Sequence, residues 1–207
     1  AVLSLSLVIF LSRDAGGWSS TRLLLTGIVV ASGWGALISF LLSISQQSQV
    51  QGMLFWLMGD FREGGPGLLH CSVLLAVLVF SLFSSRGLNL LVAGTLKAES
   101  LGVHTLRLRL AMLVGAGLLT AVAVTLAGAI GFVGLVVPHM MRLIVGSDHR
   151  RLIPASLMMG GSLLVITEML ARTLLAPRQL PVGVITAFVG VPLFLYLLRR
   201  GSRLQTQ

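Results

Sequence analysis

Long apolar runs separated by short polar segments make up most of this chain. The longest runs cover residues 23–44, 68–84, 110–130, 131–145, 152–170 and 182–198, and residues 1–12 resemble the end of another run. A transmembrane helix needs about 20 consecutive apolar residues, and most of these runs approach that length. The pattern therefore predicts an all-α polytopic membrane protein with about six transmembrane helices, preceded by the end of a further one. Residues 53–58 are apolar but too short to cross, and we expect a turn there.

One of these runs, residues 131–145, has the composition of a broken helix. Gly128, just before the run, and Gly131 and Gly134 within it loosen its start, and Pro138, followed by His139, removes a backbone donor in its middle. Irregular backbone is tolerated at membrane depth only where protein or a water-filled cavity surrounds it. We therefore expect a structural break at Gly131, Gly134, Pro138 and His139. A broken span of this kind indicates a transport protein.

Composition agrees with a membrane protein. Of the 207 residues, 56% are hydrophobic and 10% are charged, whereas soluble domains average about 25% charged residues. The single cysteine, Cys71, excludes an intramolecular disulfide and a multi-cysteine metal site. A net charge of +9 would indicate nucleic-acid binding in a soluble protein. In a membrane protein basic residues concentrate in cytoplasmic loops, so we expect no nucleic-acid partner.

The basic residues also predict which loops face the cytoplasm. With the C-terminus inside and residues 131–145 counted as a crossing, twelve of the fifteen basic residues fall inside, and Arg62, Arg172 and Arg178 fall outside. If residues 131–145 did not cross, everything before them would be inverted. Seven N-terminal bases would then face outward, against the positive-inside rule. The charge distribution therefore favours a short crossing.

The chain begins in apolar residues without an initiator methionine. A signal peptide is one interpretation, but no small-residue cleavage site follows Arg13 and Asp14. We interpret residues 1–12 as the tail of a membrane helix whose start is missing, and the sequence as the C-terminal part of a longer protein.

The sequence lacks the motifs of several catalytic and ion-coupled classes. It contains no G-x-x-x-x-G-K-[ST], so we do not expect the chain to bind ATP by itself, and it contains no H-E-x-x-H or G-x-S-x-G. The four histidines fall in different segments, which argues against a shared metal site. No series of Asp and Glu runs through the apolar segments, as a proton-coupled transporter tends to show. We therefore expect no catalytic centre, metal or bound cofactor in this chain.

Residues 86–109 contain too many polar groups to cross a membrane, and Gly94 and Gly102 divide them. We expect two short surface helices with a sharp turn. Two interpretations fit the small residues within residues 91–102. They form either an ordinary amphipathic connector or a knob that inserts into a cleft of a soluble partner.

Three motifs carry a resemblance to a known family: GFVGLVVPH at residues 131–139, DHR at 148–150 and LPVG at 180–183. In this order they resemble the C-terminal half of FecCD-type ABC importer permeases, the membrane subunits for vitamin B12, ferric siderophores and haem. The likeness covers nearly the whole chain from Arg22 on. It implies a single transmembrane permease domain over residues 1–207, whose six crossings are the fifth to tenth of ten helices.

The resemblance also implies partners and a location. Members of this family work as homodimers with two ATPase subunits, which bind ATP and Mg²⁺ in place of the permease. A periplasmic or lipid-anchored substrate-binding protein docks outside. The implied location is the bacterial cytoplasmic (inner) membrane, with lipid around the spans and a cytoplasmic C-terminus.

Functional positions follow from the same resemblance. It places residues 91–102 among the coupling helices that contact the ATPase, within the region 86–109, and the positions concerned are Leu91, Gly94, Ala98, Leu101 and Gly102. Ser19, Ser20 and Thr21 resemble a cytoplasmic gate, where small hydroxyl side chains suit a constriction that opens and reseals. Capping of the helix at residues 23–44 is equally compatible with these three residues.

Arg172 resembles an arginine that receives an acidic residue of the binding protein. The alternative is an interfacial arginine that reaches lipid headgroups. Glu168 lies four residues earlier, so the spacing allows an i,i+4 ion pair. Family members often carry Asp at position 168, where this sequence has Glu. Arg178 adds a base to a loop that is often uncharged or acidic. Glu168 and Arg178 therefore depart from the family pattern.

Asp148, His149 and Arg150 are expected to form a cytoplasmic turn that caps the helix at residues 152–170, with direct contact to the ATPase as the alternative. Pro138 and His139 are expected to be structural, with a substrate-ligand role of His139 as the alternative.

The sequence therefore predicts a translocation subunit of an ATP-driven importer for a metal chelate. An ion-coupled secondary transporter with broken helices is the alternative, and it would need a coupling-ion site. An intramembrane enzyme would need a nucleophile–base pair or a metal constellation within the spans. Neither feature is evident in the sequence.

Overall fold

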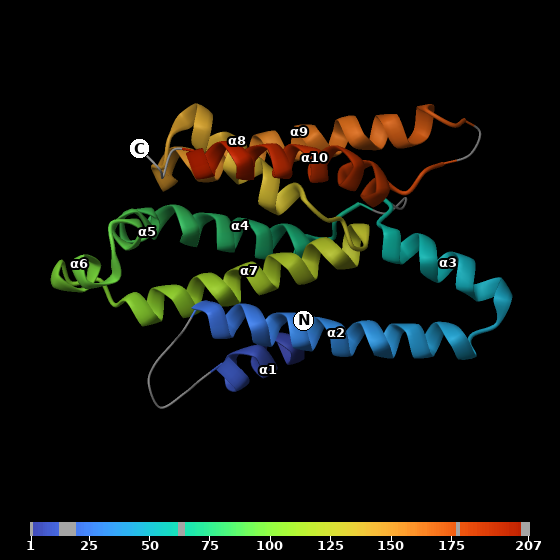
Figure 1. Ribbon diagram of the computed structural model, residues 1–207, viewed down its shortest axis with the longest axis horizontal. Coiled ribbons are helices and arrows are strands. Elements are labelled where there is room, and N and C mark those ends of the chain that lie inside the picture. Colours follow the sequence, from blue (N-terminus) through green and yellow to red (C-terminus); the bar gives the residue numbers. More distant parts are fainter. Residues whose placement is uncertain (1, 13–19, 62–64, 177–178, 204–207) are drawn as a thin grey trace.

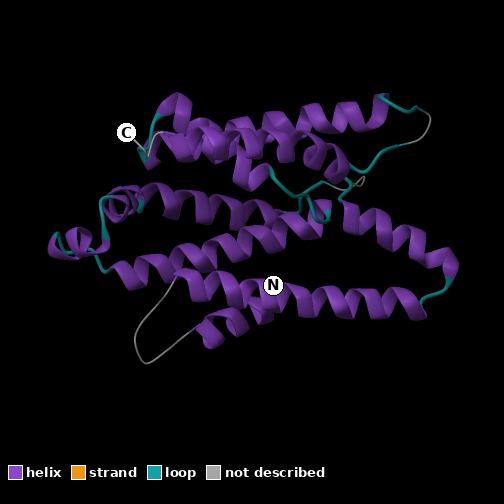
Figure 2. Ribbon diagram, viewed as in Figure 1, coloured by secondary structure: helices purple, strands orange, loops and turns teal. Residues whose placement is uncertain are grey.

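The computed structural model describes residues 2–12, 20–61, 65–176 and 179–203, and this part of the chain is helical without strands (Figures 1 and 2). The described residues form ten helices. In chain order they are α1 (Val2–Ser12), α2 (Ser20–Ile44), α3 (Gln47–Met58), α4 (Leu68–Phe83), α5 (Ser85–Val92), α6 (Thr95–Ser100), α7 (Thr105–Ala127), α8 (Val133–Val145), α9 (His149–Thr173) and α10 (Val182–Arg203).

Most of the long helices run back and forth along one direction, as the spans of a polytopic membrane protein do (Figure 1). Among the described residues, α2, α7 and α9 are long and apolar enough to cross a membrane alone. Helices α4 and α5 meet that test together but are bent by 56°, and α8 and α10 supply shorter apolar stretches. The predicted all-α polytopic fold is confirmed, and α2, α4, α7, α8, α9 and α10 correspond to the six expected crossings.

Two boundaries differ from the predicted ones. The apolar stretch expected to be a turn is the second half of α3, a helix of 12 residues that begins at Gln47 in the polar segment before it. Glutamine is a good helix former, and the charge-free segment contains nothing that stops a helix. Helix α7 begins at Thr105, so Arg107 and Arg109 lie in its first turns and not in a surface helix. Long arginine side chains can carry their charge from a helix end into the polar layer.

The break before α8 lies at the predicted glycine-rich start of this stretch and not at Pro138. Residues 128–132 separate α7 from α8, and Gly128 (φ 67°) and Phe132 (φ 66°) both adopt positive φ angles. Helix α8 then continues through Pro138, so the expectation that Pro138 and His139 fix the break is wrong. Proline pushes against the carbonyl four residues before it. That residue is Gly134, whose backbone adapts easily, whereas Gly131 lies within the break itself.

Backbone hydrogen bonds join the end of α3 to the end of α7 and to the start of α10. The amide of Asp60, just after α3, donates to the carbonyl of Ala127 at the end of α7 (3.0 Å). The amide of Val182, at the start of α10, donates to the carbonyl of Gly59 (3.0 Å). A carbonyl at the end of α7 and an amide at the start of α10, which have no partner inside their own helices, therefore find partners in the residues just after α3.

Three glycines permit the ends of α3 and α7 and the start of α10 to approach one another closely. We call these glycines the glycine junction (Gly59, Gly128 and Gly183). A Cβ added at Gly128 would lie 2.2 Å from the carbonyl oxygen of Trp56, and one at Gly183 would lie 2.0 Å from that of Met58. At Gly59 (φ 83°) a Cβ would meet a side-chain atom at 2.9 Å. Side chains cannot occupy these positions, so the ends of α3 and α7 and the start of α10 meet through bare backbone.

The buried hydrophobic residues form two small clusters. One joins α8 to the start of α9 (Val137, Met141 and Leu152), and the other joins the end of α9 to the start of α10 (Ala171, Val182 and Ile185). Helix α2, in contrast, has no buried residue in its most apolar stretch. In a membrane protein such a surface faces lipid or another chain.

We expect Gly183→Ala to destabilise the fold. Overpacking costs about 1–3 kcal/mol and occasionally more, and here the added carbon would meet a backbone carbonyl that cannot rotate away. The thermal unfolding midpoint of the detergent-solubilised protein should fall by several degrees or more. Gly161→Ala on α9 is the control, because its Cβ would meet nothing within 4 Å. Equal midpoints for the two variants would contradict the junction geometry.

Candidate functional site

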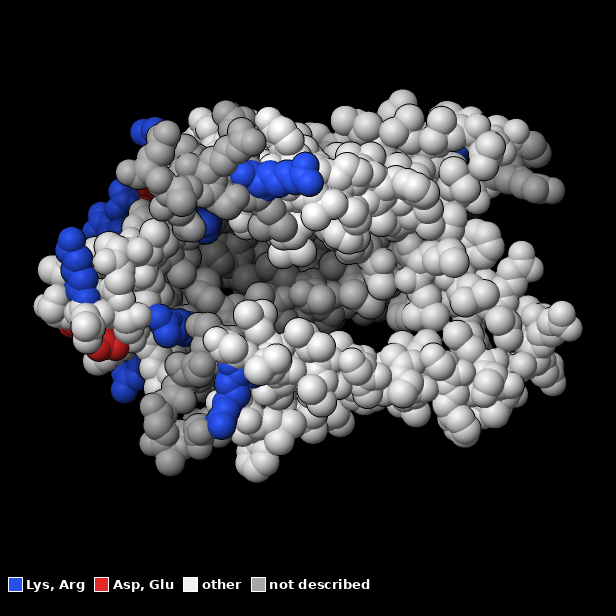
Figure 3. Space-filling model, viewed as in Figure 1, with Lys and Arg blue, Asp and Glu red and all other residues white. Residues whose placement is uncertain are grey.

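Lysine and arginine side chains gather at one end of the molecule, over α5, α6 and the starts of α7 and α9 (Figure 3). The exposed residues that define this basic end are Arg86, Lys97, Arg107, Arg109, Arg150 and Arg151. The loops that join α2 to α3 and α9 to α10 lie at the opposite, distal end (Figure 1). The two ends of the molecule therefore differ in charge, because the basic side chains of the described residues gather at only one of them (Figure 3).

At the basic end, residues 91–102 form a protrusion that we call the knob. Gly94, between α5 and α6, has φ 116° and ψ 145°, and Gly102, after α6, has φ 83°. A Cβ would meet no atom within 4 Å at either position. The two glycines are therefore required by backbone conformation and not by space. Ala98, which lies between the two turns, is completely buried.

Side-chain hydrogen bonds attach the knob to the start of α7. Thr105 Oγ1 donates to Glu99 Oε1 (2.6 Å), and Arg109 Nη2 donates to Thr95 Oγ1 (2.8 Å). Thr105 is 6% exposed, so the first of these bonds is buried at its Thr105 end, whereas Glu99 is exposed. The knob is thus fixed to a spanning helix and is not a loose connector.

Apolar side chains project from the outer surface of the knob. Val92, Leu96 and Leu101 are 64%, 85% and 59% exposed. Exposed apolar groups surrounded by polar residues mark interaction surfaces. Leu101 is among the positions that the sequence selects, whereas Leu91 is partly buried. Val92 and Leu96 were not predicted, although Leu96 is the one leucine in the otherwise small or polar helix TLKAES.

The predicted turn at Asp148, His149 and Arg150 lies beside the knob, at the start of α9. Asp148 is the N-cap residue, and its carboxylate accepts a hydrogen bond from the backbone amide of Arg150 (3.1 Å). It also accepts one from Nδ2 of Asn89 on α5 (2.7 Å). The hydrogen bond from Asn89, that from the Arg150 amide, and the charges of Arg150 and Arg151 hold the pKa of Asp148 below its ordinary 3.8. The carboxylate is therefore ionised at neutral pH.

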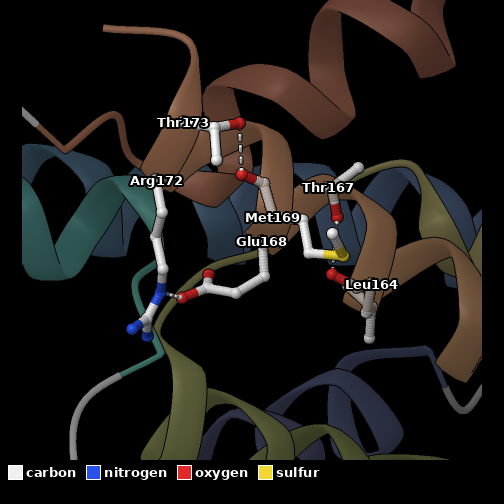
Figure 4. A network of polar contacts seen from close by, with 6 residues as sticks. All are labelled: Leu164, Thr167, Glu168, Met169, Arg172 and Thr173. Atoms are coloured by element: carbon white, nitrogen blue, oxygen red, sulfur yellow. Dashed lines mark hydrogen bonds and ion pairs between the residues drawn. The ribbon is translucent and has the colours of Figure 1, made fainter. Parts of the chain in front are cut away.

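At the distal end of α9, Arg172 Nε forms an ion pair with Glu168 Oε1, the i,i+4 contact that the spacing allows (Figure 4). The Arg172 side chain is 52% exposed and that of Glu168 is 19% exposed. Glu168 Oε2 is buried and has no hydrogen-bond partner among the described residues. The carboxylate therefore holds the guanidinium group at the surface of α9.

The remaining predicted positions are described only in part. Ser20 is the first residue of α2 and Thr21, the next, is exposed, but Ser19 lies outside the described residues, as do Arg62 and Arg178. His139 Nδ1 lies 3.1 Å from the carbonyl oxygen of Leu135. The His139 and Phe194 rings are arranged edge to face, with their centroids 6.3 Å apart. His139 thus contributes to the packing of α8 against α10.

A groove of about 570 Å³ runs along the exposed face of α10, next to the glycine junction. Its lining is mainly apolar and includes Met58, Ala187 and Phe188. A second groove, of about 730 Å³, lies between α2 and α3. Within the described ranges, no group of three or more His, Cys, Asp or Glu residues is placed to hold a metal ion. The two grooves are therefore open, mainly apolar surfaces along the spans.

The fold and these surfaces agree with the comparison with known proteins, in which a model described as the FecCD transport family matches residues 1–200. The chain belongs to the FecCD transport family. The hemin transport system permease HmuU of Yersinia pestis is 38% identical over 200 residues, which are 96% of this chain and 60% of that protein. The cobalamin import system permease BtuC of Halobacterium salinarum is 39% identical over 203 residues, which are 96% of this chain and 54% of that protein.

Solved structures agree with the FecCD assignment. One, described as an inward-facing conformation of a metal-chelate type ABC transporter, matches with a TM-score of 0.82 and 32% identity over 95% of this chain and 63% of that one. The chain therefore spans about 60% of the length of such FecCD relatives. The three FecCD-like motifs lie at structural transitions: GFVGLVVPH enters α8, DHR starts α9 and LPVG enters the glycine junction.

We expect Gly94→Ala to loosen the knob without unfolding the protein. A residue other than glycine at this φ and ψ costs on the order of 1–3 kcal/mol, and α6 has few other contacts to offset that cost. Hydrogen–deuterium exchange should become faster in residues 93–101 and stay unchanged in α9. Lys97→Ala, which removes an exposed side chain from an ordinary helical position, is the control. Exchange in the knob that matches the wild type would show that its geometry does not depend on Gly94.

Proposed function

We propose that this chain forms part of the permease subunit of an ABC importer that carries a metal chelate across the bacterial cytoplasmic membrane. The observation that carries the proposal is the FecCD family match over residues 1–200. Relatives at similar identity are named as hemin and cobalamin permeases. We therefore assign a class of substrate, which includes haem, vitamin B12 and iron–siderophores, and not a single compound.

The knob is the part of this chain that would bind the partner ATPases. Its exposed apolar side chains suit insertion into a cleft, and its attachment to α7 would transmit force to a span. Two ATPase subunits would bind ATP and Mg²⁺ and hydrolyse the ATP, and this chain would carry out no covalent chemistry. The basic end would then face the cytoplasm, as basic loops generally do, together with the C-terminal end of α10.

The distal end would receive the substrate-binding protein. Arg172 is half exposed there and is held by Glu168. A charge at the rim of an interface fixes orientation and register more than affinity. An acidic residue of the binding protein is the matching partner.

A second copy of the permease would complete the pathway, with α2 and α10 of each copy lining it. The apolar grooves beside these two helices would offer weak contacts to a bulky ligand. Selectivity would then come mainly from the binding protein. Ser19, Ser20 and Thr21, at the start of α2, would form the gate that opens when α2 changes its tilt.

The decisive test is energy dependence in proteoliposomes that contain the permease, its ATPase and its binding protein. Radiolabelled haemin and cyanocobalamin are the two probes, each supplied in parallel with and without ATP. We expect uptake of one of them to require ATP hydrolysis. Uptake driven by an ion gradient in the absence of ATP would instead support a secondary transporter.

A substitution in the knob tests the docking surface directly. We expect Leu96→Asp to abolish co-purification of the ATPase, because a carboxylate would have to be desolvated in an apolar cleft. Leu96→Met keeps an apolar side chain of similar size and should retain the ATPase. Leu96 is 85% exposed, so neither variant should disturb folding. Retention of the ATPase by Leu96→Asp would exclude this face of the knob as the contact.

A further inference from the structure

A polar contact joins α5, which leads into the knob, to the start of α9. Asn89 Nδ2 donates to Asp148 Oδ1 (2.7 Å), and Asn89 Oδ1 accepts from the backbone amide of His149 (2.9 Å). The same oxygen lies 2.7 Å from His149 Nδ1, which donates when it carries the hydrogen. We call these contacts the clamp (Asn89, Asp148 and His149). They connect residues about 60 positions apart in the sequence.

The chemistry of the clamp fixes how the amide must lie. A carboxylate only accepts hydrogen bonds, and a backbone amide only donates them. The nitrogen of the Asn89 side chain must therefore face Asp148, and its oxygen must face His149. The first amides of a helix have no partner inside the helix. Asp148, the N-cap residue of α9, accepts from the backbone amide of Arg150. Asn89, on α5, accepts from the backbone amide of His149.

The clamp differs in kind from the contact of α5 with α7. At Gly87, α5 approaches the side chain of Leu108 on α7, so that contact is apolar. Apolar contacts are not directional and allow helices to slide against each other. The clamp is directional at both atoms of one amide and holds α5 in a single register against α9.

Helix α9 extends from the clamp to the other end of the molecule. Its 25 residues correspond to roughly 37 Å at 1.5 Å per residue. Arg172 and Glu168 lie in its last turns, at the distal end. A displacement of α5 that α9 follows would therefore reach the distal surface through one rigid helix.

We infer that Asn89 is a positioning residue that makes α5 and α9 move as one unit, so that the movement of the knob during ATP hydrolysis is delivered to α9. This inference rests on the proposed function, because it needs an ATPase at the knob. It adds a named joint between the knob and a span, and it predicts that the joint stays closed throughout the transport cycle.

An exchange of the two polar side chains tests the clamp. Asn89→Asp places two carboxylates in contact and should open the clamp. Adding Asp148→Asn restores a donor facing an acceptor, since the carboxylate now at position 89 accepts from the amide now at position 148 and from His149. Asparagine also caps helices well, so the start of α9 keeps its cap. We expect ATP-driven uptake to fall roughly fivefold or more in Asn89→Asp, the low end of typical coupling between sites, and to recover in the double variant.

A distance measurement separates coupling from simple loss of folding. Spin labels at the exposed positions 86 on α5 and 151 on α9, with the exposed Cys71 replaced by Ser, report the α5–α9 distance. We expect one narrow distribution that is the same with and without trapped ATP, broadening in Asn89→Asp and narrowing again in the double variant. Thr105→Val, which removes a hydrogen bond between the knob and α7 only, should leave the distribution narrow.

Two results would overturn the inference while leaving the proposed function intact. One is ATP-driven uptake by Asn89→Asp at the rate of the wild type. The other is an α5–α9 distance in the wild type that shifts when ATP is trapped, because α5 would then move relative to α9. Loss of ATP dependence in the wild type would instead refute the proposed function, and the spin-label distances would still report whether the clamp is closed.

Discussion

Backbone polar groups cannot remain unpaired at membrane depth, and this constraint governs the structure around the glycine junction. The interruption between α7 and α8 frees amides and carbonyls that a continuous helix would pair. One of these carbonyls, that of Ala127 at the end of α7, accepts from the amide of Asp60 after α3, and the start of α10 in turn bonds to Gly59 at the end of α3. That approach requires Gly128 and Gly183, since a single added carbon at either would lie within 2.2 Å of a carbonyl oxygen. A broken span is therefore stable here because three glycine-bearing helix ends meet.

Two groups of polar contacts lie at the two ends of α9. The clamp and the charge-bearing residues around it lie at the start, and the Arg172–Glu168 pair lies at the end. Helix α9 also contacts its neighbours through two apolar clusters, one near its start and one near its end. Without a hydrophobic driving force between helices in lipid, directional contacts gain importance for register. Helix α9 is thus positioned by contacts at both of its ends.

The sequence predicts the spans well because length and hydropathy are local properties of each segment. It predicts the position of the break only in part, because Gly128 and Gly131 mark it whereas Pro138 does not. Pro138 is the strongest helix breaker in its segment, yet α8 accommodates it, and the interruption at residues 128–132 depends on contacts with α3 and α10. The glycine turns of the knob were recognisable from Gly94 and Gly102, because their requirement is conformational and local. Asn89 was not recognisable, since its partners lie about 60 residues away, and no local pattern distinguishes it from a solvated asparagine.

The distribution of charges bears on where the energy for transport enters. An ion-coupled transporter needs a cluster of ligands within its spans, at the point where the ion drives the conformational change. In the described part of this chain no group of three acidic, histidine or cysteine side chains can hold an ion, and the grooves beside α2 and α10 have mainly apolar linings. In the importer proposed above, energy would arrive through a surface instead. The knob combines exposed apolar side chains with direct attachment to α7 and, through Asn89, to α9. Under the proposed function, a partner would do the chemical work and this chain would contribute the mechanical path along which that work is transmitted.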